Sequence, residues 1–491
     1  MIVMKFGGAS LASVESIRQV IRIVGRELHR RPIMVASAIG DTTDALLELL
    51  THARRGNGYP AWKALEEIKT EHFALSEELL DGERQNGIDQ FLRDTFRDLH
   101  VRILELCEGE RGFNAELQDW VLSLGEQLSS RLLAAILDEH CGSARHVDAR
   151  KLIVTNDNFT RAEPRYWETY ARIRWCLHMA ASGSTVVLGG FIGSTQDGRT
   201  TTLGRGGSDL TASIIGAALN AEEIQVWKDV DGMLTCDPLL FDAVHQVRKL
   251  SYAEASELAS AGATILHPET MAPAQRLRIP IVIRNTFDFG CEGTRIDSRT
   301  DGNRNLVKSI AAKSGVRLLE IRSANAPDAL TELREFCQGR GEGITVLSSS
   351  EECVLIAIDK DARLPDLRPF ESGCLEVRIR NSQSILTLVG QIADPMHVSR
   401  KIAAVLHGID AFILRNERAE CSLSVAVPET EARRCIALLH DAFFANPDPA
   451  LFVVRNGAAA RIHTPQQNMA EAKRSTRFEA FVASTNILQP N

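Results

Sequence analysis

The sequence predicts an α/β fold, a three-layer sandwich around a mostly parallel sheet that is followed by two smaller ferredoxin-like units. In the first 300 residues, short apolar runs alternate with segments of helical periodicity, a pattern typical of a parallel sheet covered by helices. A polar, turn-forming segment at 297–305 then marks a boundary. Beyond it come two weakly similar units, the first with the order strand, helix, strand, strand and the second with the order strand, helix, strand, strand, helix. The latter is the order of a ferredoxin-like unit.

The strands predicted for the first region are short apolar runs. The first strand, at 2–6, ends at the pair Gly7-Gly8. The helix that follows repeats apolar residues at i, i+3, i+7 and i+10, counted from Val14. Further strands are predicted at 32–36, 184–188, 223–227 and 280–284, and residues 42–139 are predicted to be mainly helical.

The C-terminal units are predicted from repeated element patterns. The first unit has strands at 316–323, 344–349 and 353–359 and a helix at 327–338; the second has strands at 384–391, 411–415 and 421–428 and helices at 396–407 and 429–443. We expect a first domain at 1–300, ferredoxin-like domains at 306–380 and 381–446, and a partly disordered extension at 447–491. Such small sheets bind ligands or dimerise, or serve only as structural appendages.

The composition is that of a globular protein without a basic surface. Hydrophobic residues make up 44% and charged residues 24% of the chain, so each domain can bury a core. The formal net charge of −8 argues against nucleic-acid binding. The ten cysteines are scattered without metal-site spacing, so we expect buried free thiols in a reducing compartment and no metal held by protein ligands alone. Neither a secretory signal nor a long apolar run is found, so we expect a cytoplasmic protein without membrane contact.

The first strand ends in the segment Lys5–Ser10, which reads KFGGAS. Glycines at such a turn let the backbone approach a ligand and point N–H groups at phosphate oxygens. Lys5 adds a positive charge, and Ser10 can cap the next helix or bind an oxygen. The segment is not a Walker A loop, and the alternative is an ordinary turn whose lysine faces water.

The strongest functional pattern lies in Gly198–Asp209, which is rich in glycine, threonine and serine. This composition is unfavourable inside a strand or a helix, so we expect a loop that wraps an anion. Arg205 offers a planar fork for a carboxylate or a phosphate. Asp209 begins the next predicted helix and either binds Mg²⁺ or orients neighbouring donors. The alternative is a flexible surface loop capped by Asp209.

Two further segments are ambiguous on their own. Glu126 is predicted in the first turn of a helix that begins at Gly125, where a glutamate usually complements the helix dipole. The segment Ser37–Thr43 is another strand end followed by hydroxyl groups. Each supports a binding site only in combination with the others.

Taken together, the ordered segments resemble the motifs of aspartokinases, which belong to the amino-acid kinase family. The segments are KFGGAS at 5–10, SAIGDTTD at 37–44, LGEQLSSR at 124–131, TNDNFTRAEP at 155–164, FIGSTQDGRTTTLGRGGSDLTAS at 191–213, WKDVDGMLTCDP at 227–238, GATILHP at 262–268 and IPIVIRNTF at 279–287. The likeness covers 1–312, and the two following units resemble the ACT domains of that family.

The resemblance implies transfer of the ATP γ-phosphoryl group to the side-chain carboxylate of L-aspartate. The product, 4-phospho-L-aspartate, begins the pathway to lysine (through diaminopimelate), threonine and methionine. Lys5 would stabilise the transferred phosphoryl group, and Asp209 would organise the catalytic groups and Mg²⁺, which is bound mainly through ATP. Arg205 would bind the α-carboxylate and Glu126 the α-ammonium group of aspartate. The other substrate-binding residues implied are Thr43, Gly206, Gly207 and Ser208.

The nucleotide site implied by the resemblance is less complete. Its residues are Lys5, Phe6, Gly7, Gly8, Ser10, Lys228, Asp229, Leu234 and Thr264. Some family members carry Tyr at the position of Leu234 and Lys at that of Thr264. Polar contacts to the base or ribose are therefore absent or replaced here, and Lys228 is the candidate replacement.

The ACT resemblance implies a homodimer and an amino-acid effector. At 323–328 the chain reads SANAPD, where members with a working first ACT domain carry a glycine-containing turn, so effector binding stays open. Two rival functions are a kinase of glutamate or N-acetylglutamate and an inactive relative that senses an amino acid. Glu126 and the ACT-like units argue against the first rival, and the complete set Lys5, Glu126, Arg205 and Asp209 argues against the second.

Overall fold

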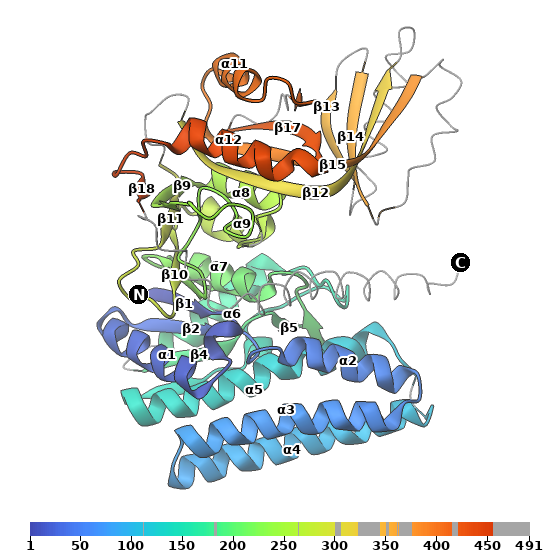
Figure 1. Cartoon of the computed structure of the whole chain (residues 1–491). Coiled ribbons are helices and arrows are strands. Elements are labelled where there is room, and N and C mark those ends of the chain that lie inside the picture. Colours follow the sequence, from blue (N-terminus) through green and yellow to red (C-terminus); the bar gives the residue numbers. More distant parts are fainter. Residues whose placement is uncertain are drawn as a thin grey trace. The chain divides into compact units, whose positions relative to one another are not determined.

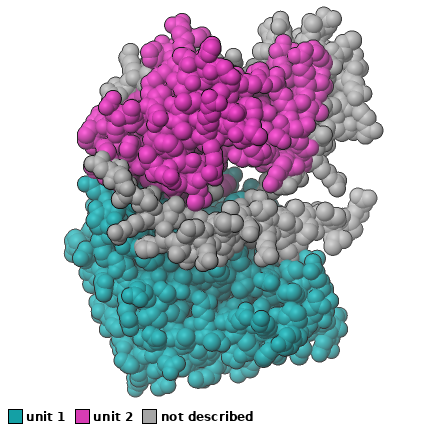
Figure 2. Space-filling view, in the orientation of Figure 1, with its two compact units in different colours: residues 1–232, 269–297, 461–491 teal, residues 233–268, 298–460 magenta. Residues whose placement is uncertain are grey.

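A computed structural model describes residues 1–110, 112–180, 184–263, 265–299, 306–322, 344–349, 353–360, 362, 376–414 and 421–454. The chain divides into two compact units, coloured separately in Figure 2. The described residues of unit 1 lie in Met1–Gly232 and Glu269–Asp297, and those of unit 2 in Met233–Pro268 and Ser298–Ala460. The segment Met233–Pro268 thus groups with the C-terminal half of the chain, whereas the domain bounds given above stay a prediction.

Unit 1 is built on a mostly parallel sheet, which confirms the predicted fold class. Its strands run in the order β3-β4-β2-β1-β7-β10-β11. Figure 1 shows α5 on one side of this sheet and α7 on the other. Burial on both faces explains why the first two strands are apolar without alternation, apart from Lys5 in β1. The strands are β1 (Ile2–Phe6), β2 (Pro32–Ala36), β3 (Ala144–His146), β4 (Thr185–Gly189), β7 (Ile224–Lys228), β10 (Ile281–Asn285) and β11 (Thr294–Asp297).

Two helices of unit 1 start at side-chain caps that the sequence supplies. The Ser13 side chain caps α1, and the Asn114 side chain caps α5 by accepting from Leu117 N at 2.7 Å. In the described part no helix is long and apolar enough to cross a membrane. The helices are α1 (Val14–Glu27), α2 (Thr42–Arg54), α3 (Gly58–Leu79), α4 (Gly82–Cys107), α5 (Ala115–Cys141), α6 (Tyr166–Ala180), α7 (Gly207–Leu219) and α9 (Pro268–Arg276), with short 3₁₀ helices at Ala9–Leu11, Leu28–Arg30 and Ala149–Lys151.

Two local predictions in unit 1 are wrong. Glu126 does not lie in a first turn, because α5 begins eleven residues earlier at Ala115 and runs for 27 residues. The predicted anion-wrapping loop contains a strand, β6 (Thr200–Thr202), which pairs antiparallel with β5 (Ile192–Ser194). Threonine is β-branched and suits a strand once its hydroxyl finds a buried partner, as Thr201 does in Thr155, with 2.8 Å between their oxygens.

Unit 2 centres on a six-stranded antiparallel sheet in the order β13-β14-β12-β15-β17-β16. Its two long strands, β12 (Leu306–Arg322) and β15 (Glu376–Gln391), pair along most of their length, so the two ferredoxin-like units share one sheet. Helix α12 packs against β12, β15 and β17 (Figure 1). The remaining elements are β8 (Gln246–Val247), β9 (Lys249–Ser251), α8 (Tyr252–Ser260), β13 (Ile344–Ser349), β14 (Cys353–Asp359), α11 (Pro395–Val405), β16 (Phe412–Leu414), β17 (Ser422–Pro428), a 3₁₀ helix at Glu429–Glu431, α12 (Ala432–Phe444) and β18 (Phe452–Val453).

The predictions for the C-terminal half have mixed outcomes. The strands at 344–349 and 353–359 are confirmed at their predicted bounds. The helix predicted at 327–338 and most of the predicted extension lie outside the described residues. The cysteines of the described part are free thiols, as expected, but among these only Cys236 and Cys435 are buried.

Candidate active site

Three charged side chains meet at the ends of β1 and β7 and the first turn of α7. Lys5 Nζ lies 2.7 Å from Asp209 Oδ1, and Lys228 Nζ lies 3.6 Å from Asp209 Oδ2. Burial alone would raise the pKa of Asp209, but the charges of Lys228 and Lys5 outweigh it and lower that pKa. Asp209 is therefore an ionised carboxylate that holds two cationic groups at one point, an arrangement suited to a polyanionic ligand.

The backbone explains why Asp209 reaches this point. Parallel strands end at the same edge of a sheet, so Lys5 of β1 and Lys228 of β7 lie close together. Gly206 is the N-cap of α7 and has a φ of 67°, a left-handed conformation that glycine adopts without strain. The helix therefore begins at Gly207, two residues earlier than predicted, and Asp209 lies in its first turn.

A buried carboxylic acid lies beside this cluster. Glu126 is 3% exposed, and its Oε1 accepts a hydrogen bond from Ala38 N at 3.2 Å. Its Oε2 is buried and has no hydrogen-bond partner in the described part of the chain. Burial raises the pKa of Glu126 to about 8, although the Ala38 N–H, Lys5 and the Ser208 hydroxyl act in the opposite direction. A buried acceptor without a partner is costly unless a ligand supplies the donor.

Glycines at the end of β4 bring Glu126 and Ser208 together. A Cβ added to Gly190 would lie 2.6 Å from Ser208 Cβ, and one added to Gly189 would lie 3.0 Å from Glu126 Cβ. The missing side chains thus let α5 and α7 approach each other over this strand end. Thr43 lies near the same place, with its Oγ1 3.7 Å from a Cβ built on Gly125.

The glycine turn after β1 packs on the neighbouring strands. Gly7 N donates to Trp227 O at 3.1 Å, and Gly40 N donates to Gly8 O at 3.1 Å. Ser10 does not cap the next helix, because its buried hydroxyl lies 2.7 Å from Thr286 Oγ1 and Ser13 provides the cap. The side chain of Phe6 is buried and stacks on Trp227, with 6.0 Å between ring centroids.

The other predicted site residues are less closely grouped. Arg205 has an exposed side chain and lies between β6 and the Gly206-Gly207 start of α7. Asp229 follows the end of β7 and is partly buried. Leu234 belongs to unit 2, and Thr264 lies outside the described residues.

One buried carboxylate was not predicted from the sequence. Asp119 of α5 is 0% exposed and accepts hydrogen bonds from Thr160 N, Thr202 N and Thr202 Oγ1. Burial raises its pKa to about 6. Its signal in the sequence is an acidic residue between the apolar positions Leu117 and Val121 of a helix.

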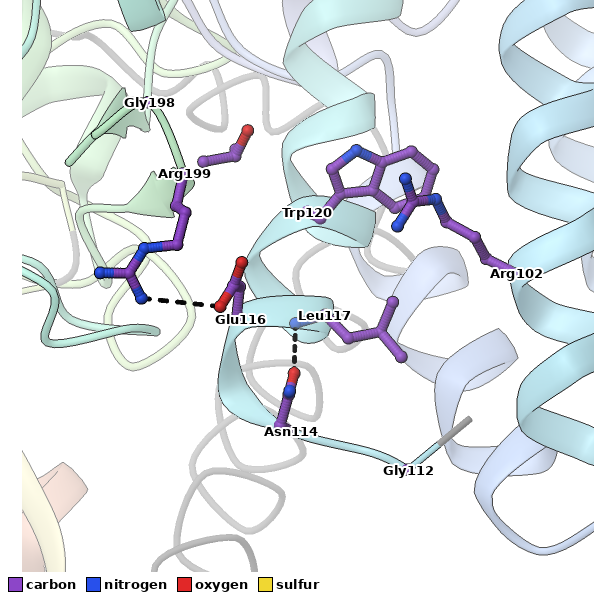
Figure 3. Close-up of a pocket in the computed structure, with 9 residues that line it drawn as sticks. Arg102, Gly112, Asn114, Glu116, Leu117, Trp120, Gly198 and Arg199 are labelled. Carbon is purple, nitrogen blue, oxygen red and sulfur yellow. Dashed lines mark hydrogen bonds and ion pairs between the residues drawn. The ribbon is translucent and has the colours of Figure 1, made fainter. Parts of the chain in front are cut away.

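One cavity of unit 1 is separate from these residues. It has a volume of about 680 Å³ and lies at the N-terminal end of α5 (Figure 3). Figure 3 shows Arg199 paired with Glu116, at 3.6 Å, and the Arg102 guanidinium stands 4.0 Å from the centre of a Trp120 ring. Because its charged groups already pair with neighbours and none of the residues implied to bind aspartate or the nucleotide lines it, we assign the active site to the Lys5, Asp209 and Glu126 region instead.

Metal ligands form no cluster of their own in the described residues, where no group of three or more His, Cys, Asp or Glu side chains could hold a metal ion.

Comparisons with known proteins agree with this geometry. Residues 1–285 match the amino acid kinase family. The chain is 30% identical to aspartokinase 1 of Arabidopsis thaliana chloroplasts over 94% of this chain and 84% of that protein. It is 29% identical to the lysine-sensitive aspartokinase 3 of Escherichia coli over 90% of this chain and 99% of that protein. Its fold matches the structure of E. coli aspartokinase III in complex with aspartate and ADP, with a TM-score of 0.77, 28% identity and coverage of 90% and 100%. The aspartate kinase of Clostridium acetobutylicum matches with a TM-score of 0.72, 26% identity and coverage of 90% and 100%.

Proposed function

This chain belongs to the aspartokinases of the amino acid kinase family, and we propose that it transfers the γ-phosphoryl group of ATP to the side-chain carboxylate of L-aspartate. The observation that carries the proposal is the pair of complementary sites in unit 1. The Lys5 and Lys228 ammonium groups, which Asp209 holds at one point, suit the phosphates, and the unpartnered Glu126 Oε2 suits an ammonium group. The E. coli relative was solved with aspartate and ADP, which supports the same pair of ligands here.

The substrate site uses one anchor of each charge. Glu126 binds the α-ammonium group, because its buried oxygen lacks a donor. Arg205 binds the α-carboxylate through its planar fork. Thr43 and Ser208 add hydroxyl groups, and the backbone N–H groups of Gly206 and Gly207 lie at the positive end of α7.

The reaction needs no general base. The side-chain carboxylate of aspartate is ionised at neutral pH, so one of its oxygens attacks the γ-phosphorus while the bond between that phosphorus and the leaving ADP oxygen breaks. Lys5 stabilises the negative charge of the transferred group, and Asp209 fixes the positions of Lys5 and Lys228. Positioning and electrostatic stabilisation supply the rate.

The nucleotide lies on the Gly7-Gly8 turn, with Lys228 and Asp229 beside it. Asp209 fits a role near Mg²⁺, since its carboxylate is ionised. Mg²⁺ held mainly by ATP oxygens neutralises phosphate charge when it is bound. Phe6 and Ser10 are buried and support the turn from below.

Turnover with alternative acceptors tests the proposal. The purified chain with Mg·ATP should release ADP and form a hydroxylamine-trapped acyl phosphate with L-aspartate. L-Glutamate should react poorly. N-Acetyl-L-glutamate should also react poorly, because it lacks the ammonium group that Glu126 requires. Asp209→Asn should lower kcat by at least about 10²-fold without loss of fold. A chain that phosphorylates glutamate faster than aspartate would have a different function.

We also propose a homodimer formed through the ACT-like units and regulated by an amino acid. The support is the continuous sheet of unit 2 and the relative described as lysine-sensitive. Light scattering should give twice the 54.1 kDa mass of the chain. Titration of activity with lysine, threonine and methionine, alone and in pairs, identifies the effector.

A further inference from the structure

Asp119 joins three segments that are distant in sequence. It lies on α5, and both of its oxygens accept from Thr160 N, at 2.9 Å each. Thr202 of β6 donates its N–H at 2.8 Å and its hydroxyl at 2.7 Å. The carboxylate is completely buried, so water cannot replace these bonds when one of them is lost.

The clamped strand leads directly to Arg205. Ala162 N donates to Thr202 O at 2.9 Å, and Leu203 N donates to Phe191 O at 2.8 Å. A Cβ added to Gly204 would lie 3.4 Å from Thr160 O, so this glycine packs on the second segment that Asp119 holds. The backbone is therefore fixed up to the residue before Arg205.

The same helix also carries Glu126. Seven residues of α-helix separate the two acids, which corresponds to about 10 Å along α5. We propose that Asp119 is a positioning residue that sets Arg205 at the distance from Glu126 which L-aspartate requires. This inference rests on the proposed function, since it assigns Arg205 and Glu126 to the two charged groups of one amino acid.

Asparagine is the informative replacement. Asp119→Asn keeps the size of the side chain but turns an NH₂ group toward N–H donors, so at least one hydrogen bond is lost. We expect the KM for aspartate to rise roughly 10- to 100-fold, with the KM for ATP within about twofold of the wild type. Asp119→Glu, which keeps the carboxylate, should recover part of the loss.

A double-mutant cycle separates an effect on the position of Arg205 from a non-specific effect on the structure of unit 1. If Asp119 acts through Arg205, then Asp119→Asn should change aspartate KM little in an Arg205→Ala background. Equal effects in both backgrounds, or equal rises in both KM values, would overturn the inference. Asp148→Asn is the matched control, because Asp148 is a partly buried carboxylate of unit 1 bound to Arg150. The KM of this variant for aspartate should equal that of the wild type.

Two further measurements keep the test decisive. If Asp119→Asn does not fold, Thr202→Val removes only the hydroxyl donor to Asp119, and it should raise aspartate KM severalfold and leave ATP KM unchanged. An unchanged aspartate KM in that variant counts against the inference. Wild-type turnover is measured first, and no phosphorylation of aspartate means that the proposed function has failed. If the wild type is active but replacement of Asp119 leaves the KM for aspartate unchanged, only the positioning role is contradicted.

Discussion

Glu126 combines two properties that oppose each other in a ligand-free site. Its carboxyl group is buried, which raises its pKa to about 8, and it is the group expected to pair with a cation. At neutral pH the empty site therefore holds mostly the neutral acid. Binding of an ammonium group then requires that the proton leave.

This coupling predicts that aspartate binds more tightly as pH rises through about 8. Below that pH, binding to the carboxylate form must release a proton, so affinity falls about tenfold for each further pH unit. Calorimetry in two buffers of different ionisation enthalpy should detect close to one proton released near pH 7. Glu126→Gln should abolish both effects and weaken aspartate binding. A pH-independent affinity in the wild type would show that Glu126 does not contact the ammonium group.

The same group predicts a pH-dependent stability without ligand. The folded pKa of about 8 exceeds the ordinary value of 4.5, so the folded state holds the proton more tightly than the unfolded state does. The stabilising contribution is complete below pH 4.5 and is lost as pH rises through about 8. As the pH is raised from 5 to 9, the unfolding free energy of Glu126→Gln should therefore increase relative to that of the wild type, by on the order of a few kcal/mol. Urea unfolding of unit 1 at both pH values measures this difference.

At the scale of elements, sequence reasoning succeeded where one signal dominates. The runs at 2–6 and 32–36 are buried on both faces, and their predicted bounds are those of β1 and β2. It failed where tertiary partners decide. Thr200–Thr202 forms a strand because Asp119 and Thr155 satisfy its hydroxyl groups, and both partners lie far away in sequence.

The candidate site shows the same division. Lys5 and Asp209 were predicted from turn and helix-start patterns, and the structure brings them together. The orphaned oxygen of Glu126 could not be predicted, because Glu126 packs closely on Gly189, which follows it by 63 positions. Glycines that serve a close approach look like turn residues until the partner is known.

The contact between β4 and α7 gives a prediction for Gly190. A Cβ at this position would lie 2.6 Å from Ser208 Cβ and 2.7 Å from Ser208 Cα, so Gly190→Ala must push the start of α7 away. We expect a loss of about 1–3 kcal/mol in unfolding free energy and a fall in kcat, because Asp209 moves with the helix. Urea unfolding and turnover measure the two effects.

Gly25 supplies the matched control. It lies inside α1, and a Cβ there would meet nothing within 4 Å. Gly25→Ala should therefore stabilise unit 1 by about 0.5–1 kcal/mol and leave kcat unchanged. Equal behaviour of the two variants would mean that Gly190 matters only as a flexible residue and that the approach of α7 to β4 is unimportant.

At the scale of the whole molecule, the two units differ in how they hold charge in the interior. The described part of unit 1 buries charged side chains at its candidate active site and also at Asp119. Unit 2 buries an ion pair between β12 and the start of α8, where Lys308 Nζ lies 3.0 Å from Glu254 Oε2 and both side chains are less than 5% exposed. Glu254 also caps α8 through Ser251 N, at 2.6 Å. Removal of one partner from such a pair leaves an uncompensated buried charge.

Lys308→Met should therefore destabilise unit 2 by about 3–5 kcal/mol and leave unit 1 unchanged, if each unit unfolds by itself. Tryptophan fluorescence reports the unfolding of unit 1 separately from that of unit 2, because all five tryptophans lie in Met1–Gly232 of unit 1. In urea, the fluorescence transition should stay in place while part of the circular dichroism transition moves to lower urea. Lys313→Met is the control on the same strand: its pair with Asp359, at 2.7 Å, is about one third exposed, so its loss should cost less than about 1 kcal/mol. A fluorescence transition that shifts together with the dichroism would show that the two units unfold as one cooperative structure.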